Sequence, residues 1–310
     1  MSITFQVHWL SVTVWANEDY GLKMWEVWFE HDLGPLHPTG HGGKGFRKLY
    51  KALVESKLYT TPINQDILEG KEYFSIELPG KACEAIEDKL IQEFIVTTDR
   101  FEDAKITRLD MAWDGVGFEP ETVKQAIDNE QLRSYARRSS MQYIIHPYEQ
   151  REDGQLGTSA VRLGSNQSSR LLRVYDKHGP VRVELQSRDK RADLIARDVL
   201  RLLPRQWFDP ALGHLRDYID FIDPETKVLL PWWSQFIHNQ DRAQKVVADA
   251  KQVELSRLVA YLKKQASPSL SVMADVIGAH SVDALIIEGR RTRGKKYDGL
   301  LQAAAKEKKL

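Results

Sequence analysis

A strict alternation of apolar and polar residues is the feature that most constrains the fold of this chain. In residues 3–15, Ile3, Phe5 and Val7 alternate with polar neighbours. Successive side chains of a strand point to opposite faces, so each alternating stretch predicts a β-strand with one apolar and one polar face. The same pattern recurs later in the chain, at residues 108–114, 160–163, 171–177 and 181–186.

Stretches with helical spacing lie between and after these strands. Residues 82–96, for example, place Ala82, Ile86 and Phe94 on one apolar stripe. A stretch rich in Gly, Pro and His predicts a loop over residues 33–45. Further helices are predicted over residues 47–55, 120–129 and 190–203.

The order of strands and helices repeats once along the chain. Ile76-Glu77-Leu78 is followed by an alanine eight residues after its glutamate, and Val183-Glu184-Leu185 is followed in the same way. Leu10-Ser11-Val12 stands where Leu109-Asp110-Met111 stands in the second copy. We therefore predict an α+β fold with antiparallel sheets from two related β-α-β-β-α halves. A chance similarity between the two copies is the alternative.

The character of the sequence changes near residue 240. Residues 240–266 have the spacing of a long amphipathic helix, which Pro268 ends. Two short helical stretches around residues 278–280 then faintly resemble a helix-turn-helix, and a capping helix pair is the plainer alternative. The predicted domains are a first half (1–100), a second half (101–240) and a helical C-terminal region with a basic tail (241–310).

The polar faces of the four later strands carry side chains suited to phosphate chemistry. Carboxylate oxygens bind Mg²⁺ or Mn²⁺, guanidinium groups hold phosphate oxygens, and a hydroxyl can act as a nucleophile. A solvated face with cross-strand ion pairs is the alternative that this pattern leaves open. The residues concerned are Arg108, Asp110, Asp114, Arg162, Arg173, Tyr175, Lys177, Arg182 and Glu184.

Composition limits the class of protein. The chain has 310 residues, and Lys plus Arg equal Asp plus Glu at 44 each, so any surface for nucleic acid must be local. Cys83 is the only cysteine, which excludes an intramolecular disulfide and predicts a reducing, cytoplasmic compartment. The first residues lack a basic leader, and no run approaches the roughly 20 apolar residues of a membrane helix, so no membrane partner is expected.

Two familiar motifs are excluded. His37 and His41 lie in the glycine-rich loop, and the sequence has no His-hydrophobic-His cluster, so the histidines predict no zinc site and no histidine-based nicking site. Residues 40–46, GHGGKGF, lack both the spacing of a phosphate-binding loop and the Ser or Thr after Lys44. We expect a flexible loop here that can touch DNA.

Three segments on the later strands, in their order and spacing, resemble the replication initiation factor family, Rep_trans. They are RLDMAWDG (108–115), VRLGSNQSSRLLRVYDKHG (161–179) and VRVELQSRDKRA (181–192). The N-terminal segments HWLSVTV and YFSIELPGKACEAI are also similar to that family. The resemblance covers residues 7–200, and residues beyond about 210 resemble no family that we can name.

The resemblance implies a set of functional residues and places catalysis in the half that spans 101–240. It carries the nucleophilic tyrosine onto Tyr175, and the acids that bind Mg²⁺ or Mn²⁺ onto Asp110, Glu184 and Asp114. Its implied phosphate-holding or charge-stabilising residues are Arg173, Lys177 and Arg182. We further expect DNA contacts from Arg108, Arg162, Arg290, Arg291 and Arg293.

The function implied by the resemblance is initiation of rolling-circle DNA replication. The protein would bind the origin, nick one strand through a 5′-phosphotyrosine intermediate and leave a 3′-hydroxyl for host helicase and polymerase. With one nucleophile per chain, a homodimer would suit the second strand transfer. The alternatives are a relaxase of an integrative element, a non-catalytic DNA-binding protein on the same scaffold, and a domain whose polar sheet face binds a small anion.

Overall fold

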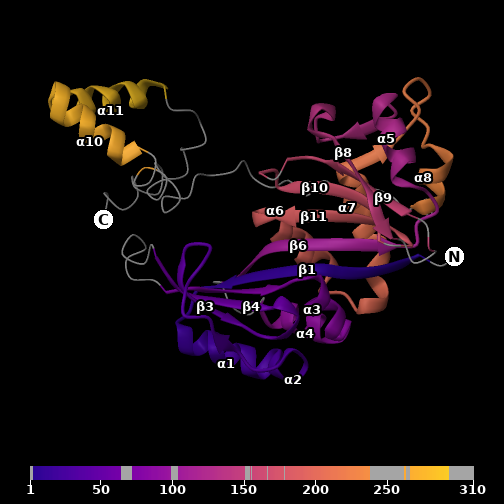
Figure 1. The fold of residues 1–310 in the computed structure, drawn as a ribbon, viewed down its shortest axis with the longest axis horizontal. Helices are drawn as coiled ribbons and strands as arrows, with labels where there is room; N and C mark the ends of the chain where they lie inside the picture. The colour runs from indigo at the N-terminus through magenta and orange to yellow at the C-terminus, as the bar shows by residue number, and fades with distance from the viewer. Residues whose placement is uncertain are drawn as a thin grey trace. The chain divides into compact units, whose positions relative to one another are not determined.

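A large antiparallel sheet is the centre of the fold in this computed structural model (Figure 1). The structure describes residues 3–63, 72–98, 104–150, 154, 156–165, 167–177, 179–237, 262 and 266–292. The chain divides into two compact units. One consists of Met1–Thr61 and Glu72–Val246 and contains most of the sheet, and the other consists of Pro62–Lys71 and Val247–Leu310.

The sheet has ten strands in the order β2-β3-β4-β5-β1-β6-β11-β10-β9-β8. Strands β1 (Thr4–Val14) and β6 (Ala104–Asp114) pair antiparallel at its centre. Beyond β1 lie β5 (Phe74–Leu78), β4 (Lys57–Pro62), β3 (Phe46–Lys51) and β2 (His37–Pro38). Beyond β6 lie β11 (Val181–Arg188), β10 (Arg170–Asp176), β9 (Leu156–Leu163) and β8 (Gln142–Gln150).

The strand order confirms that the fold consists of two related halves. In each half the first strand lies at the centre, the last strand lies next to it, and the preceding strands follow outward. Each half has more strands than the predicted β-α-β-β-α unit, and both halves share one continuous sheet.

One predicted correspondence between the halves is out of register. The ladders place Ser11 opposite Glu77 in the first half, and Ala112 opposite Glu184 in the second. Asp110 instead lies opposite Gln186. If Glu77 corresponds to Glu184, then Ser11 corresponds to Ala112, so its predicted match with Asp110 is displaced by two residues.

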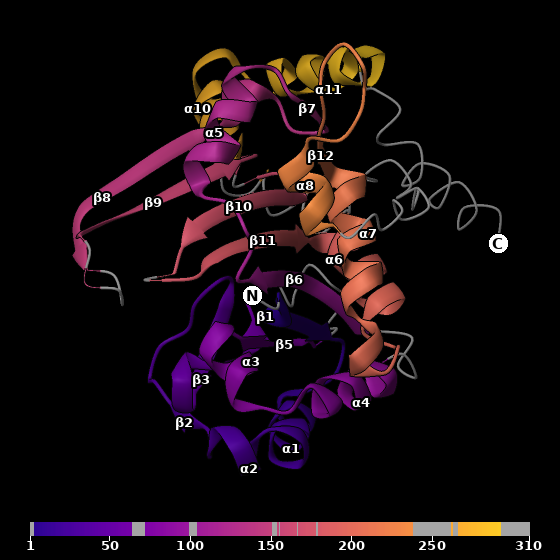
Figure 2. The same ribbon diagram turned by 90° about the vertical axis from the view of Figure 1, so that its right-hand side faces the viewer.

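Helices cover the apolar face of the sheet. Figure 2 shows α4 (Asp88–Thr98), α6 (Asp189–Val199) and α7 (Phe208–Tyr218) along one side of it. Strand residues such as Leu109, Met111, Val183 and Leu185 are fully buried in this core, as their alternation predicts. The other α-helices described in this unit are α1 (Glu18–Trp28), α2 (Glu30–Leu33), α3 (Gly80–Ala85), α5 (Pro120–Asp128) and α8 (Pro231–Phe236).

Short elements complete this unit. Strands β7 (Leu132–Ser134) and β12 (Ile219–Phe221) form a separate two-stranded sheet. The 3₁₀ helices are η1 (Leu53–Glu55), η3 (Arg138–Ser140) and η4 (Pro204–Gln206).

Two helix predictions are wrong in ways that have physical reasons. Residues 47–55 form most of β3 and η1 instead of a helix, because Phe46 and Leu49 pack with Tyr59 of β4 in a small apolar cluster. The helix predicted over 82–96 is divided into α3 and α4, because the backbone at Ile86 is extended.

In the second unit, α10 (Ser267–Ile277) and α11 (His280–Thr292) follow one another directly. Gly278 ends α10 with φ 102°, a conformation that favours glycine, and its backbone N–H donates to the Ala274 carbonyl. The long helix predicted over 240–266 falls almost wholly outside the described residues, so the domain boundary near 240 stays a prediction. No helix in the described ranges is long and apolar enough to span a membrane.

Candidate active site on the polar face of the sheet

Tyr175 and Glu184 form the centre of the polar face of the second half. Tyr175 lies on β10 and Glu184 on the neighbouring β11. The Tyr175 hydroxyl donates a hydrogen bond of 3.0 Å to Glu184 Oε2. The Glu184 side chain is fully buried, whereas Tyr175 keeps part of its surface exposed. Tyr175 is therefore partly accessible to solvent, while its hydroxyl donates to a buried carboxylate.

Arg173 connects Glu184 with the second acid, Asp110 of β6. Its terminal nitrogen lies 2.7 Å from Glu184 Oε1 and 3.2 Å from Asp110 Oδ2. Arg108 also binds Asp110 through two nitrogens, at 3.0 and 2.6 Å. The sheet thus brings the predicted tyrosine, both principal acids and Arg173 together.

The two acids respond differently to this setting. Burial raises the pKa of Asp110, an effect that Arg108 opposes and the charge of Glu184 reinforces. Burial also acts on Glu184, but the nearby His8 ring and the charge of Arg173 outweigh it and lower the pKa of that carboxyl. Glu184 therefore keeps its negative charge, and Asp110 is the member of the pair that protonates first.

The pKa of Tyr175 is raised well above its usual value. Burial is the main cause, the negative charge of Glu184 adds to it, and Arg182 partly offsets it. The phenol is consequently protonated at neutral pH. Any reaction at its oxygen must begin with loss of a proton, for which Glu184 is the bonded acceptor.

Arg182 and Asp114 form a separate pair beside Tyr175. Arg182 lies opposite Tyr175 in the ladder, is fully buried, and donates to Asp114 at 2.5 and 2.6 Å. Asp114 lies four residues from Asp110 on the same strand, or about 13 Å along it. The structure therefore does not bring Asp114 together with Asp110, and Asp114 pairs with Arg182 and Lys177.

We expect Asp114→Ala to lower the free energy of unfolding by roughly 3 kcal/mol, because buried Arg182 would lose its counter-ion. Urea unfolding followed by circular dichroism measures this loss. Asp114→Asn is the matched variant and should cost less, since its amide oxygen still accepts from the guanidinium. An Asp114→Ala protein with an unchanged midpoint would contradict the structural role.

Lys177 lies just after β10 and points to acids other than Glu184. Its Nζ atom is 3.5 Å from Glu84 of α3 and 4.0 Å from Asp114. Arg162 of β9 lies opposite Arg173 in the ladder. Arg290 and Arg291 lie exposed in the last turn of α11, in the other unit, and Arg293 falls outside the described residues.

Sequence reasoning missed three residues of this face: His8, Glu84 and Gln186. His8 Nδ1 lies 3.3 Å from Glu184 Oε2, at an irregularity of β1 between Val7 and Trp9. Gly80 permits this position, because an added Cβ would come within 2.4 Å of the His8 ring. Gln186 donates to Asp110, and its place on an alternating strand could have identified it. A strand irregularity leaves no such signal.

Asp110 and Glu184 fit a divalent cation by their chemistry, since both present carboxylate oxygens in a buried setting. Glu184 Oε1 and His8 Nδ1 are buried and lie at ion-pair distance from Arg173 and from Glu184 Oε2, but neither contact has hydrogen-bond geometry. Within the described ranges, however, no group of three or more His, Cys, Asp or Glu side chains is arranged to hold a metal ion. The pair is therefore at most a two-residue site whose charge Arg108 and Arg173 now balance.

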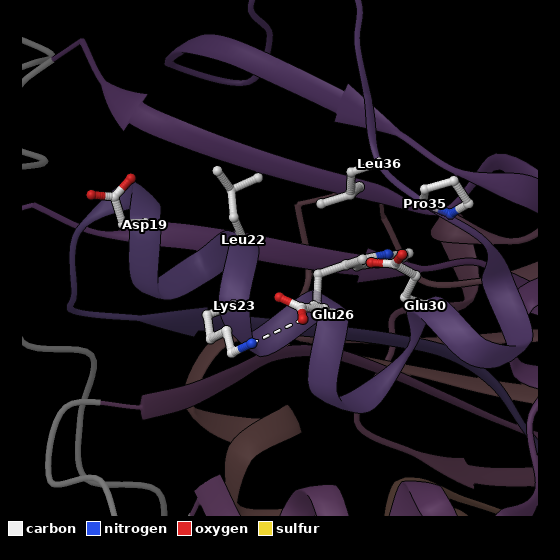
Figure 3. A pocket seen from close by; sticks show the side chains of 8 residues that line it. Asp19, Leu22, Lys23, Glu26, Glu30, Pro35 and Leu36 are labelled. Atoms are coloured by element: carbon white, nitrogen blue, oxygen red, sulfur yellow. Dashed lines mark hydrogen bonds and ion pairs between the residues drawn. The ribbon is translucent and has the colours of Figure 1, made fainter.

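A pocket elsewhere on the protein does not belong to this site. It has a volume of about 380 Å³ and lies at α1, α2 and the segment after them (Figure 3). Its charged lining residues are three acids and one lysine, Lys23, which pairs with Glu26 at 2.9 Å. This lining is unsuited to a phosphate and contains none of the polar-face residues.

Comparisons with known proteins bear on the same part of the chain. A family model described as a replication initiation factor matches residues 104–286, more than half of the chain. The fold is similar to that of a rolling circle replication initiator protein from Geobacillus stearothermophilus, with a TM-score of 0.59 and 20% sequence identity. That match covers 79% of this chain and 99% of the other. No curated protein matches the chain.

Proposed function

Because this chain belongs to the replication initiation factor family, we propose that it starts rolling-circle replication by nicking one DNA strand with Tyr175. The observation that carries this proposal is the hydrogen bond from the Tyr175 hydroxyl to buried Glu184, beside Arg173 and Asp110. It joins a nucleophile, a proton acceptor and a cation on the polar face of one sheet.

The proposed step is a phosphoryl transfer. The phenolic proton passes to Glu184 Oε2 as the Tyr175 oxygen attacks the scissile phosphate, because the lowered pKa of Glu184 and the raised pKa of Tyr175 oppose a transfer before the attack. The bond to the 3′ oxygen breaks, and that oxygen takes a proton from solvent. The products are a 5′-phosphotyrosine and a free 3′-hydroxyl, so the energy of the phosphodiester bond is kept for later strand joining.

The cations of the site favour this step electrostatically. Arg182 lies opposite Tyr175 and stabilises the phenolate, as its effect on the tyrosine pKa indicates. Arg173 stands beside the proton acceptor and can pair with charge that develops on the phosphate. Lys177, which lies near Glu84 and Asp114, would exchange these acids for a phosphate of the DNA.

Asp110 and Glu184 would hold the divalent cation, Mg²⁺ or Mn²⁺. When bound, that cation would polarise the phosphate and neutralise its charge. Glu184 Oε1 lies 2.7 Å from Arg173, whereas Oε2 accepts the hydrogen bond from Tyr175. One carboxylate oxygen can therefore contact a cation while the other accepts the phenolic proton.

The test is incubation of the full chain with single-stranded origin oligonucleotides and Mn²⁺. We expect a covalent protein–DNA species that retains the label of the 5′ end created by cleavage, and mass spectrometry should locate the DNA on Tyr175. Attachment through another residue, or none with any origin strand, would overturn the proposal. Origin DNA, host helicase and polymerase are the proposed partners, and a homodimer would supply a second nucleophile.

A further inference from the structure

Four arginines crowd one corner of the polar face. Arg188 lies opposite Arg108 in the β11–β6 ladder, and Arg173 lies opposite Arg162 in the β10–β9 ladder. Burial lowers the pKa of the Arg188 guanidinium, and the charges of Arg108, Arg173 and Arg162 lower it further, although Asp110 opposes them. The guanidinium groups therefore repel one another, and Asp110 and Glu184, which pair with Arg108 and Arg173, offset only part of that charge.

Two donor atoms in this corner are buried without a hydrogen-bond partner. They are Nε of Arg162 and Nε of Arg173. A buried N–H that makes no hydrogen bond is costly, and a charged one more so. An anion between these strands would satisfy both donors and remove the mutual repulsion of the arginines.

An aromatic ring adjoins the same arginines. The Arg108 guanidinium lies 3.8 Å from the centroid of the Trp9 ring, and the Trp9 indole N–H donates to Ser11 Oγ at 2.8 Å. Trp9 is half-buried and lies opposite Asp110 in the β1–β6 ladder. A fixed aromatic ring stacked with arginine is a surface on which a nucleic-acid base can stack.

This corner is close to the reacting groups but distinct from them. Gln186 and Asp110, which lie opposite each other, are two residues along their strands from the row of Glu184, or about 7 Å. Arg188 and Arg108 lie one further row away. Arg162, by contrast, lies in the row of Arg173 and Glu184. An anion held between Arg162 and the Arg188 and Arg108 pair is therefore displaced from the phosphate that Tyr175 attacks, and it can belong to the same strand.

We propose that Arg108, Arg162 and Arg188 form a subsite for a non-scissile phosphate of the single DNA strand, with Trp9 beside it for a base. The inference rests on the proposed function, since it takes the nicked strand as the ligand. It gives the strand a direction across the sheet, from Tyr175 of β10 toward the β6 end of the arginine corner. The ligand class is a single-stranded phosphodiester chain, and recognition needs no particular base.

The test measures DNA binding separately from nicking. Tyr175→Phe, which cannot form the adduct, is the background for Arg188→Gln and for Arg162→Gln. The probe is a fluorescent oligothymidylate of twelve nucleotides. Its fluorescence anisotropy reports binding across a range of salt concentrations. We expect each glutamine variant to bind about tenfold more weakly. We also expect the slope of log affinity against log salt to become shallower by about 0.7 for each phosphate that the variant no longer neutralises.

Arg205→Gln is the matched control, because Arg205 is an exposed arginine of η4, which contacts α4 and α7. It should leave both affinity and salt slope unchanged. Thermal unfolding identifies a glutamine variant that fails to fold. If one of the two fails, the measurement on the other decides the test. Unchanged slopes in the folded glutamine variants would overturn the subsite. Absence of a covalent adduct in the wild-type protein would instead overturn the role of Tyr175.

Discussion

Tyr175→Phe is expected to abolish strand nicking and the covalent adduct, with a loss of at least about a thousandfold. The substitution removes a single oxygen, which is the proposed nucleophile and the donor to Glu184. The half-buried ring stays in place, so the variant should fold with a loss of only about 1 kcal/mol. The oligonucleotide carries its label at the scissile phosphate, which becomes the 5′ end after cleavage. Denaturing gels then measure the labelled adduct directly.

Tyr143→Phe is the matched control for this prediction. Tyr143 lies on β8 and also donates its hydroxyl to a carboxylate, that of Glu121. Its loss removes the same chemical group from the same sheet, and nicking should persist at the wild-type rate. A Tyr175→Phe protein that still became linked to the labelled end would assign the chemistry to another residue.

Glu184→Gln should have the second largest effect, a fall in the nicking rate of about 10² to 10⁴. The amide keeps the shape of the side chain but cannot take the proton of Tyr175 or balance the charge of Arg173. Response to Mn²⁺ should also weaken, because one of two proposed ligands is neutralised. Rates measured across a Mn²⁺ titration, with EDTA as the zero point, test both consequences.

The first half of the fold supplies the control for Glu184. Glu77 is also buried, at 3% exposure, and its Oε1 accepts from Lys44 at 2.6 Å. Glu77→Gln therefore removes a buried, paired carboxylate from an equivalent strand without touching Tyr175. Both variants should lose stability, but only Glu184→Gln should lose nicking. Equal losses of activity would show that Glu184 acts through stability alone.

Strand parity is the part of this fold that sequence predicts best. Leu109, Met111 and Val183 are buried, as their period-two spacing requires, because only one face of each strand can join the core. The alternative of a merely solvated polar face is wrong at the centre. Cross-strand ion pairs are present there, but Arg182 and Glu184 are fully buried.

The partners of each charged side chain could not be predicted in the same way. Alternation places Asp110 and Asp114 on one face, but it does not state which arginine each of them meets. That choice depends on ladder register, which puts Arg182 opposite Asp114 and Gln186 opposite Asp110. His8 lies at a local irregularity of β1, so its contact with Glu184 does not follow from the ladder register of its neighbours.

The pairing of β1 with β6 joins the two halves of the chain. His8 crosses it to approach Glu184, although the family model begins at residue 104, in β6. A protein shortened to that starting point would keep Tyr175 and both acids. It would also expose the unpaired backbone edge of β6, an open template for association with other chains. The first hundred residues therefore cover, through β1, an edge of β6 that would otherwise be open to association.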